Sequence, residues 1–175
     1  MARRYLCEVV ATEPSEGAAR GAAKLFDVPV VRASAEATPF RDDCFDVALL
    51  LGVVSVVPAS VTVLAEAGRL APTVAVLEYV SVGTAAVRAG GSVFPTRCQL
   101  ASASRAAGLE VVAAVDQSVP APPSWTSDSP APNVGSRTSV SVKELEQATD
   151  SEQEVADAIA RGRLIPHTML ARRQR

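Results

Sequence analysis

The sequence predicts an α/β domain whose mostly parallel sheet is flanked by helices. Short apolar runs alternate along the chain with segments of helical periodicity, which is the arrangement of βαβ units. The 175 residues are 48% hydrophobic but only 4% aromatic, so the core consists mainly of Val, Ala and Leu, as suits a sheet covered by helices. This length is typical of one domain, and we expect residues 1–175 to form a single domain.

The composition excludes several classes of protein. A net charge of −2 lacks the basic excess of a typical nucleic-acid binder, so we expect no nucleic-acid partner. The cysteines are odd in number and have no CxxC spacing, which indicates neither a disulfide scaffold nor a metal site. We expect buried, reduced thiols in a cytoplasmic protein at these three positions: Cys7, Cys44 and Cys98.

One segment has the apolar character of a membrane span. Residues 47–65 carry no charge and are nearly long enough to cross a bilayer. Gly52 and Pro58 interrupt the run, and its pattern changes midway, so a strand, a loop and a helix explain it better. Glu8 interrupts the apolar residues near the N-terminus, which argues against a signal peptide. We therefore expect no membrane partner.

The first elements follow one another closely. Residues 8–12 predict a short buried strand, and Ser15 can cap a helix over residues 16–26. Glu16 lies at the positive end of that helix, where a carboxylate is favoured. Residues 28–31 predict the second strand.

The next segment holds the third and fourth predicted strands and a helix between them. Residues 45–51 are apolar almost throughout, which predicts a third strand buried on both faces. A helix over residues 59–70 follows and ends before Pro72, and residues 73–79 predict the fourth strand. That helix is expected to bury one apolar face, formed by Val63, Leu64, Ala67 and Leu70.

The remaining chain holds one more strand, a loop and the C-terminal elements. Pro95 fits the start of a helix and Gly108 its C-terminal cap, and residues 109–115 predict the fifth strand. Residues 116–140 are rich in Pro and Ser and contain the sole tryptophan, Trp125, which indicates an extended loop inserted before the last elements.

Two capping boxes, at residues 141–144 and 151–154, predict two helices, the second ending near Gly162. Residues 163–172 then predict a last strand. Pro166 cannot donate a ladder hydrogen bond. We therefore expect either that this strand lies at an edge of the sheet or that Pro166 lies at a strand end.

Candidate binding residues follow three of the predicted strands, at the edge where open α/β sheets bind ligands. Glu13 lies past a strand end and before a helix, and is well placed to accept hydrogen bonds from both hydroxyls of a ribose. The next strand is followed by short side chains and backbone amides that fit the edge of an adenine, although an exposed turn would have the same sequence: Ser34, Ala35 and Glu36. Leu51 and Gly52 end the third strand at the same crevice, as direct contacts or simply as core and turn.

In this order and spacing, the segments resemble class I S-adenosylmethionine-dependent methyltransferases. The turn of residues 12–15 is similar to the family's acidic ribose-binding position, and residues 35–40 to its adenine-side segment. Further resemblances are those of residues 45–47 to the start of the fourth family strand, residues 66–72 to the turn before the fifth, and residues 163–173 to the closing antiparallel strand. The resemblance implies a Rossmann-like fold, S-adenosylmethionine as cofactor, and methyl transfer to a small-molecule substrate.

Two departures from the family pattern stand out. Ser34 occupies the position of an aspartate beside the adenine amino group, and no GxG pattern occurs in the chain. Residues 1–6 look like the tail of the helix that follows the family's glycine-rich turn, so the resemblance implies an N-terminally incomplete, truncated domain. The missing strand would lie between the strands that carry Glu13 and Leu51, which would then expose backbone groups. We therefore expect weak S-adenosylmethionine binding.

No catalytic residue is singled out by the sequence. Tyr79 and Trp125 are expected on the substrate side, and a position in the last strand favours a structural role for the sole histidine, His167. One alternative is a non-catalytic methyltransferase-like domain that acts by forming a homo-oligomer or by associating with a partner. A second is a nicotinamide-dependent enzyme, against which stand the missing glycine fingerprint and the lack of a Tyr-x-x-x-Lys pair.

Overall fold

The computed structural model of the chain describes residues 7–26, 28–117 and 142–174. Its first elements are β1 (Ala11–Thr12), α2 (Glu16–Phe26) and β2 (Val30–Val31). The bounds of α2 are those that the sequence predicts, whereas both strands are shorter than predicted. β3 (Val47–Leu51) and α3 (Ser60–Leu70) follow. The apolar run of residues 47–65 is therefore a strand, a loop and a helix, as expected.

The second half of the described chain begins with β4 (Thr73–Ser81) and a hairpin of β5 (Val87–Ala89) and β6 (Ser92–Phe94), which the sequence analysis did not predict. α4 (Arg97–Ala106), β7 (Leu109–Asp116), α5 (Val142–Ala160) and β8 (Leu164–Arg173) complete the fold. Most of the inserted loop predicted over residues 116–140 lies outside the described residues, as does Trp125.

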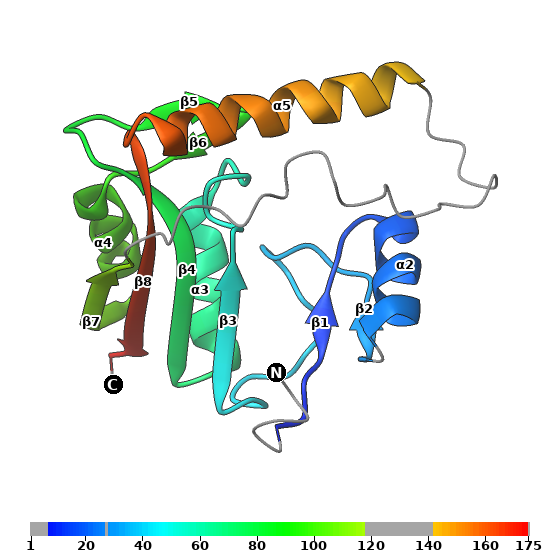
Figure 1. Cartoon of the computed structure of the whole chain (residues 1–175). Helices are drawn as coiled ribbons and strands as arrows, with labels where there is room; N and C mark the ends of the chain where they lie inside the picture. The colour runs from blue at the N-terminus through cyan, green and yellow to red at the C-terminus, as the bar shows by residue number, and fades with distance from the viewer. Residues whose placement is uncertain (1–6, 27, 118–141, 175) are drawn as a thin grey trace.

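The strands of the described chain form a larger mixed sheet and two small ones. The larger sheet has the order β3-β4-β8-β7, in which β3 and β4 are parallel, and β8 is antiparallel to both β4 and β7. The antiparallel last strand is thus confirmed, while parallel pairing is limited to β3–β4 and to the separate pair β1–β2. β1 and β3 have the same direction in Figure 1 but do not pair with each other.

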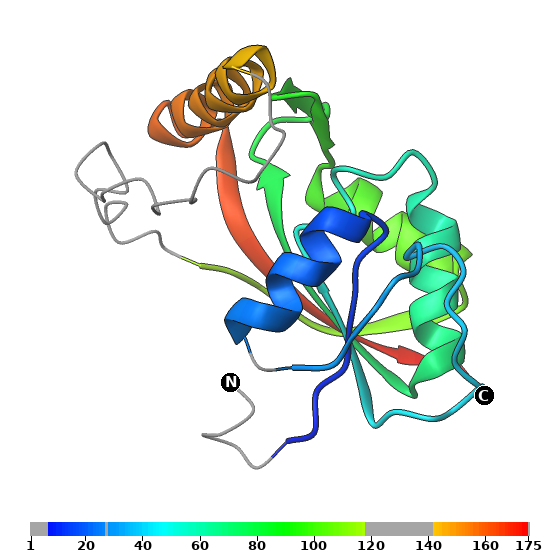
Figure 2. The same cartoon turned by 90° about the vertical axis from the view of Figure 1, so that its right-hand side faces the viewer.

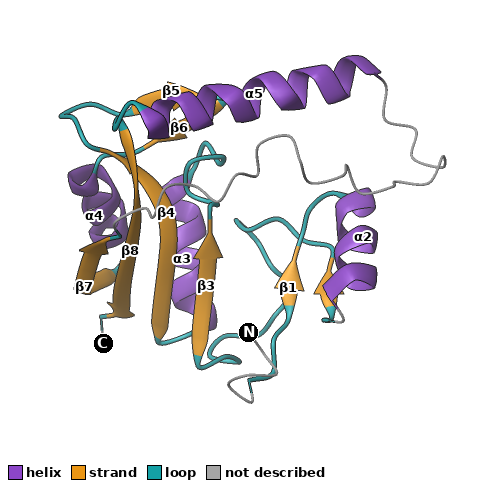
Figure 3. Cartoon of the chain, viewed as in Figure 1, coloured by secondary structure: helices purple, strands orange, loops and turns teal. Residues whose placement is uncertain are grey.

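Helices α3 and α4 cover one face of the larger sheet, as Figures 1 and 2 show together. The core between them holds the predicted face of α3, including the fully buried Val63 and Leu64, together with Val74, Val76 and Met169 of the sheet. Figure 3 shows α5 lying across the upper ends of the strands. It packs over the β5–β6 hairpin through Val155, Ala158 and Ile159.

Burial contradicts two sequence predictions. β3 is not buried on both faces, because Val47, Leu49 and Leu51 are 46–57% exposed on the face that α3 does not cover. A strand is buried on both faces only when other elements pack against both of them. No described helix lies over this face of β3. The three cysteines are also exposed rather than buried, because each lies in a loop or on the first turn of a helix: Cys7, Cys44 and Cys98.

Two predictions about the C-terminal elements are also wrong in part. A single helix, α5, replaces the two predicted helices, since nothing in its sequence near Ser151 breaks the helix. The last strand, β8, lies inside its sheet between β4 and β7 rather than at an edge. Pro166 is tolerated because it is the third residue of β8, near the strand end, as the other half of that prediction stated.

Candidate functional site

The candidate site lies at the carboxyl ends of β1, β2, β3 and β4. In each of the two parallel pairs, the carboxyl ends of both strands lie at one edge. Glu13 follows β1, the turn of residues 34–37 follows β2, and Gly52 follows β3. The fold therefore brings the predicted cofactor-side residues to one edge, although those of β1 and β2 belong to a sheet that does not pair with β3.

Glu13 forms the turn between β1 and α2. Its backbone amide donates to the Val31 carbonyl (3.1 Å), and its carboxylate oxygen Oε1 accepts a hydrogen bond from the Ser15 amide (2.8 Å). The residue is therefore held by its backbone amide and by one carboxylate oxygen, while Oε2 makes no hydrogen bond within the described residues. A half-buried carboxylate with one free oxygen can accept hydrogen bonds from neighbouring hydroxyls.

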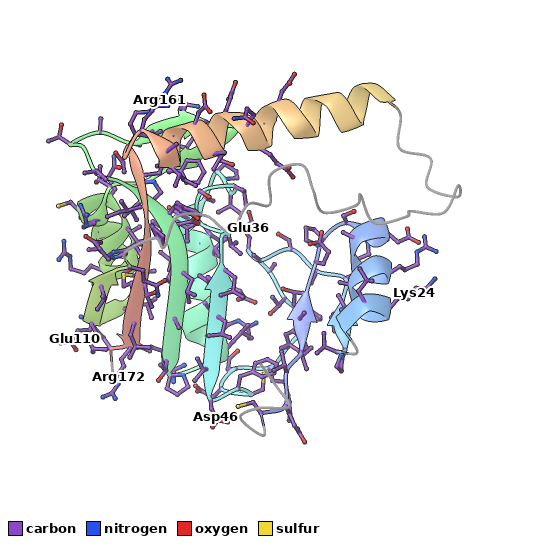
Figure 4. All side chains as sticks on the ribbon, viewed as in Figure 1. Lys24, Glu36, Asp46, Glu110, Arg161 and Arg172 are labelled. Carbon is purple, nitrogen blue, oxygen red and sulfur yellow. The ribbon has the colours of Figure 1, made fainter. Side chains whose placement is uncertain are left out.

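The turn after β2 is closed by its own side chains. The Ser34 hydroxyl donates to the Glu36 carboxylate, and the Ala37 amide donates to the Ser34 carbonyl (3.3 Å). The Ser34 hydrogen bond, and next the Glu36 backbone amide, hold the pKa of Glu36 below its ordinary value. Ala35 packs against the hydrophobic core of the larger sheet, and this contact anchors the turn on the core. In Figure 4, Glu36 lies between β3 and β1.

A cluster on α3 holds the segment after this turn in place. Glu66 Oε1 accepts hydrogen bonds from both the amide and the hydroxyl of Thr38, at 2.8 and 2.6 Å. The Arg69 guanidinium binds both oxygens of Glu66 at 2.7 Å and also donates to the Phe40 carbonyl (2.9 Å). The nitrogen that donates to Phe40, Nη1, also donates to the Asp42 carboxylate (2.6 Å). We call Glu66, Arg69 and Thr38 the α3 clamp, because together they fix residues 38–42 on the helix.

The role of the α3 clamp was not predicted from the sequence, in which residues 66–72 carried only a family resemblance. The signal that was present is the spacing of an acid and an arginine three residues apart on a helix, which places them side by side. Their partner, Thr38, is 28 residues away from Glu66 in sequence, and no local pattern shows that contact.

The α3 clamp predicts how stability responds to acid. The hydrogen bonds of Arg69 lower the pKa of Glu66 from 4.5 to about 2. A carboxylate whose pKa is lowered by folding contributes its full stabilisation above its ordinary pKa and loses it as the pH falls toward the folded-state value. We expect urea midpoints to fall between about pH 5 and pH 2, and to fall less in Glu66→Gln, which cannot titrate. If the urea midpoint fell equally with pH in both proteins, this role of Glu66 would be contradicted.

A second buried carboxylate orders the loop after β3. Glu78 accepts hydrogen bonds from the amide of Ser55 (2.9 Å), from its hydroxyl (3.1 Å) and from the amide of Tyr79 (3.0 Å). Both Glu78 and Ser55 are buried. Gly52 begins this loop with a φ of +66°, a conformation that glycine adopts without strain. These hydrogen bonds fix the loop after β3 on β4, at the strand ends that form the candidate site.

A hollow of about 340 Å³ lies beside these strand ends. Side chains alternate along β4, so Leu77 and Tyr79 face the side opposite to Glu78. Tyr79 also packs against the α5 cluster, with Val155 and Ile159. The sequence-predicted residues Leu51, Gly52 and Tyr79 are therefore brought together in one hollow, whose other lining residues are Leu77, Glu78, Gln117, Pro166, His167 and Thr168.

His167 has a partner on the α4 side of the sheet. Its Nδ1 lies 2.8 Å from Asp116 Oδ1, and Arg97 Nε lies 2.9 Å from both oxygens of the same carboxylate. Arg97 first, and then His167, lowers the pKa of Asp116 to about 2. The imidazole is 6% exposed and also lines a second hollow, between α4 and β7. These contacts fit the structural role that the sequence predicts.

The described residues contain no group of three His, Cys, Asp or Glu side chains arranged to hold a metal ion. Among the helices of the described chain, none has both the length and the apolar character that a membrane crossing requires.

Comparison with known proteins defines the class of this fold. Residues 1–72 match a family model described as a methyltransferase domain. No curated protein matches the sequence. The structure resembles that of the 4+2 cyclase SpnF at 19% identity and a TM-score of 0.66, covering 98% of this chain and 68% of that one.

Two further similar structures are methyltransferases by description. A putative sarcosine dimethylglycine methyltransferase from Galdieria sulphuraria shares 14% identity with a TM-score of 0.66, covering 99% of this chain and 72% of that one. Geranyl diphosphate C-methyltransferase from Streptomyces coelicolor, in complex with S-adenosyl-L-homocysteine, shares 15% identity with a TM-score of 0.64, covering 99% of this chain and 65% of that one.

These matches confirm the resemblance to class I S-adenosylmethionine-dependent methyltransferases. The sequence signature covers residues 1–72, and the Rossmann-like methyltransferase fold covers nearly the whole chain. The chain spans only about two thirds of the length of these structures, between 65% and 72%. Because a cyclase shares the fold, the fold alone does not define the reaction.

Proposed function

We propose that the protein binds S-adenosylmethionine at the carboxyl ends of β1, β2 and β3 and transfers its methyl group to a small molecule. The observation that carries the proposal is the convergence of Glu13, the Ser34–Glu36 turn and Gly52 at one edge of the strands, in a chain whose first 72 residues match a methyltransferase domain. Similar structures were determined with S-adenosylmethionine or S-adenosyl-L-homocysteine bound.

Each of these residues has a defined task in the proposed site. Oε2 of Glu13, which has no hydrogen bond to the part of the chain that the structure describes, would accept hydrogen bonds from the ribose hydroxyls. Ser34 and Glu36 offer the acceptors for an adenine amino group, and the carboxylate of Glu36 is the stronger of the two. This pair replaces the single aspartate of the family pattern. Ala35 anchors the turn on the hydrophobic core.

Methyl transfer from this cofactor requires mainly that the protein position the reacting groups. The bound cofactor supplies an activated methyl group on its sulfonium. The chain must hold the acceptor beside it and exclude water, which are tasks of orientation. The hollow lined by Leu51, Leu77 and Tyr79 is suited to an apolar part of a small-molecule acceptor. His167 is held by Asp116 and is not assigned a part in proton transfer.

We expect cofactor binding by this chain to be weak. Glu13 and the Ser34–Glu36 turn belong to a two-stranded sheet that makes no ladder with β3. Holding the two parts of the site in one geometry therefore has an entropic cost that a continuous sheet would not have, and this cost lowers affinity. Such affinity is best measured by methods that detect weak complexes.

The Glu13 carboxylate provides a direct test of the site. We expect Glu13→Ala to weaken the binding of S-adenosyl-L-homocysteine about tenfold, the effect of losing one to two hydrogen bonds to a carboxylate. Glu110→Ala is the matched control, because Glu110 is exposed on β7 at the far edge of the sheet, as Figure 4 shows. Equal affinity of both variants in an NMR titration would show that Glu13 is not a ligand.

A second candidate function is association without catalysis, with a partner or as a homo-oligomer. The observation in its favour is that β1 and β3 each leave one edge unpaired among the described residues. Size-exclusion chromatography with and without S-adenosylmethionine distinguishes the two candidates. A stable oligomer whose size is unaffected by the cofactor, in a chain that shows no cofactor binding, would favour association.

A further inference from the structure

A second hollow, of about 330 Å³, lies where α4 packs on β7 at one end of the larger sheet (Figure 1). This volume is in the range of sites that bind small molecules. The lining is partly apolar, but four of its side chains can carry charge or react: Arg97, Cys98, Asp116 and His167. None of the four has a task in the proposed cofactor site, so the chemistry of this cluster is separate from the proposed methyl transfer.

The His167 imidazole belongs to this hollow rather than to the one beside Tyr79. Side chains alternate along a strand, so His167 shares a face of β8 with Met169, which lines the hollow between α4 and β7. Pro166 and Thr168 lie on the opposite face and line the hollow beside Tyr79. The imidazole, although only 6% exposed, therefore lies on the face of the second hollow.

The Asp116 carboxylate leaves one nitrogen of this imidazole available. Arg97 first, and then His167, lowers the pKa of Asp116 to about 2, so at neutral pH the carboxylate accepts hydrogen bonds and cannot donate them. The proton between them is therefore carried by His167 Nδ1, 2.8 Å from Asp116 Oδ1. In the neutral ring Nε2 is then an acceptor, and it makes no hydrogen bond within the described residues.

Cys98 brings a thiol to the same hollow. It is exposed, and as the second residue of α4 it lies in the turn that carries the partial positive charge of a helix N-terminus. The Cys98 sulfur is also near the guanidinium of Arg97, because Asp116 first, and then the charge at Cys98, raises the pKa of Arg97. A thiol beside a cation and an oriented acceptor nitrogen has the surroundings of a reactive cysteine.

Arg97 has one nitrogen left for a bound molecule. Its Nε and Nη2 bind Asp116, whereas Nη1 makes no hydrogen bond within the described residues. The side chain is 40% exposed, so Nη1 is within reach of a molecule that enters from solvent. A guanidinium nitrogen in this position favours a carboxylate.

We propose that Cys98 forms a reversible mixed disulfide with a small, carboxylate-bearing disulfide of the glutathione type, in the hollow between α4 and β7. The Cys98 sulfur forms a bond with one sulfur of the incoming disulfide, and the other half leaves as a thiolate. Cys98 is thereby oxidised and the leaving half reduced. The thiol proton passes to His167 Nε2, directly or through a water, and from there to the leaving thiolate. Arg97 Nη1 binds a carboxylate of the half that stays.

The test compares two exposed thiols of the same chain. Cys44 is the matched control, because it is exposed, lines neither hollow and follows Asp43 in place of an arginine. The full chain carrying Cys7→Ser and Cys44→Ser retains Cys98 alone, and the chain carrying Cys7→Ser and Cys98→Ser retains Cys44 alone. Each protein is incubated with oxidised glutathione or with the uncharged hydroxyethyl disulfide, and mixed-disulfide formation is followed by intact-mass spectrometry.

We expect Cys98 to react with oxidised glutathione about tenfold faster than Cys44, and to remain the faster thiol with hydroxyethyl disulfide. Arg97→Gln should lower the rate with oxidised glutathione more than the rate with hydroxyethyl disulfide. His167→Gln, which can still donate to Asp116 but has no basic nitrogen, should remove most of the difference between the two thiols.

Equal rates at Cys98 and Cys44 with both reagents would overturn the proposal, and this comparison holds even if a substitution at His167 prevents folding. A fast Cys98 whose rate is unchanged in a folded His167→Gln protein would overturn the proton transfer. Because no S-adenosylmethionine is present, failure here leaves the proposed cofactor site untouched, and failure of cofactor binding leaves this result untouched.

Discussion

Gly90→Ala is expected to destabilise the protein by about 3 kcal/mol and to release α5 from the β5–β6 hairpin. Gly90 has a φ of +55°, and a Cβ at this position would lie 2.4 Å from the Ser151 carbonyl oxygen of α5. The left-handed backbone costs an alanine about 1 kcal/mol, and forcing the helix away costs about 2 kcal/mol more. The displaced helix would also lose the hydrogen bond from the Gly90 amide to Glu154 (2.7 Å).

The neighbouring residue provides the control for this prediction. Gly91 has a φ of +77°, but a Cβ there would meet no atom within 4 Å, so Gly91→Ala should cost only the backbone term of about 1 kcal/mol. Urea unfolding measures the stability of both variants, and limited proteolysis reports whether α5 is released. Equal destabilisation by the two substitutions would show that the contact with Ser151 does not hold α5.

The second large effect is expected for Glu66→Ala, which removes the centre of the α3 clamp. The carboxylate, 11% exposed, accepts two hydrogen bonds from Thr38 and two from Arg69. We expect a loss of about 2–3 kcal/mol in the free energy of unfolding, because charge-assisted hydrogen bonds are replaced by water only in part. The loss should be accompanied by faster exchange of the Thr38 amide.

The Glu66→Ala variant also links the fold to the site. Release of residues 38–42 from α3 would loosen the neighbouring Ser34–Glu36 turn, so S-adenosyl-L-homocysteine binding should weaken together with stability. Glu110→Ala again serves as the exposed control and should change the urea midpoint little. A Glu66→Ala protein as stable as the parent would show that the clamp contributes nothing to the fold.

Local patterns were sufficient for most elements of the fold. The Ser15 and Glu16 signals place the start of α2 correctly, and the periodicity of residues 59–70 identifies the buried face of α3, because both depend on neighbours within one or two turns. The β5–β6 hairpin was missed although Gly90 and Gly91 form the two-residue turn, with positive φ at both positions, that marks a hairpin. That signal was available in the sequence.

Features that depend on distant partners were not predictable. The apolar sequence of β3 indicated burial on both faces, but burial requires a neighbouring element and the described chain supplies one on a single face. Pro166 indicated an edge, whereas β8 is internal because β4 and β7 pair on both of its sides. At the site, Glu13, Ser34, Ala35, Glu36, Leu51 and Gly52 remain predictions as ligands, while the contacts of Glu66 with Thr38 and of Glu78 with Ser55 were absent from any local pattern.

The most direct test of the proposed cofactor site is an NMR titration of the isotopically labelled chain with S-adenosyl-L-homocysteine. We predict progressive shifts of the amide signals of Glu13, Ser34 to Ala37 and Gly52, with weak affinity. Signals of the hollow between α4 and β7, such as those of Ala101 and Ala114, should not move. No shift at up to about 5 mM ligand, or shifts confined to that second hollow, would contradict the proposed site.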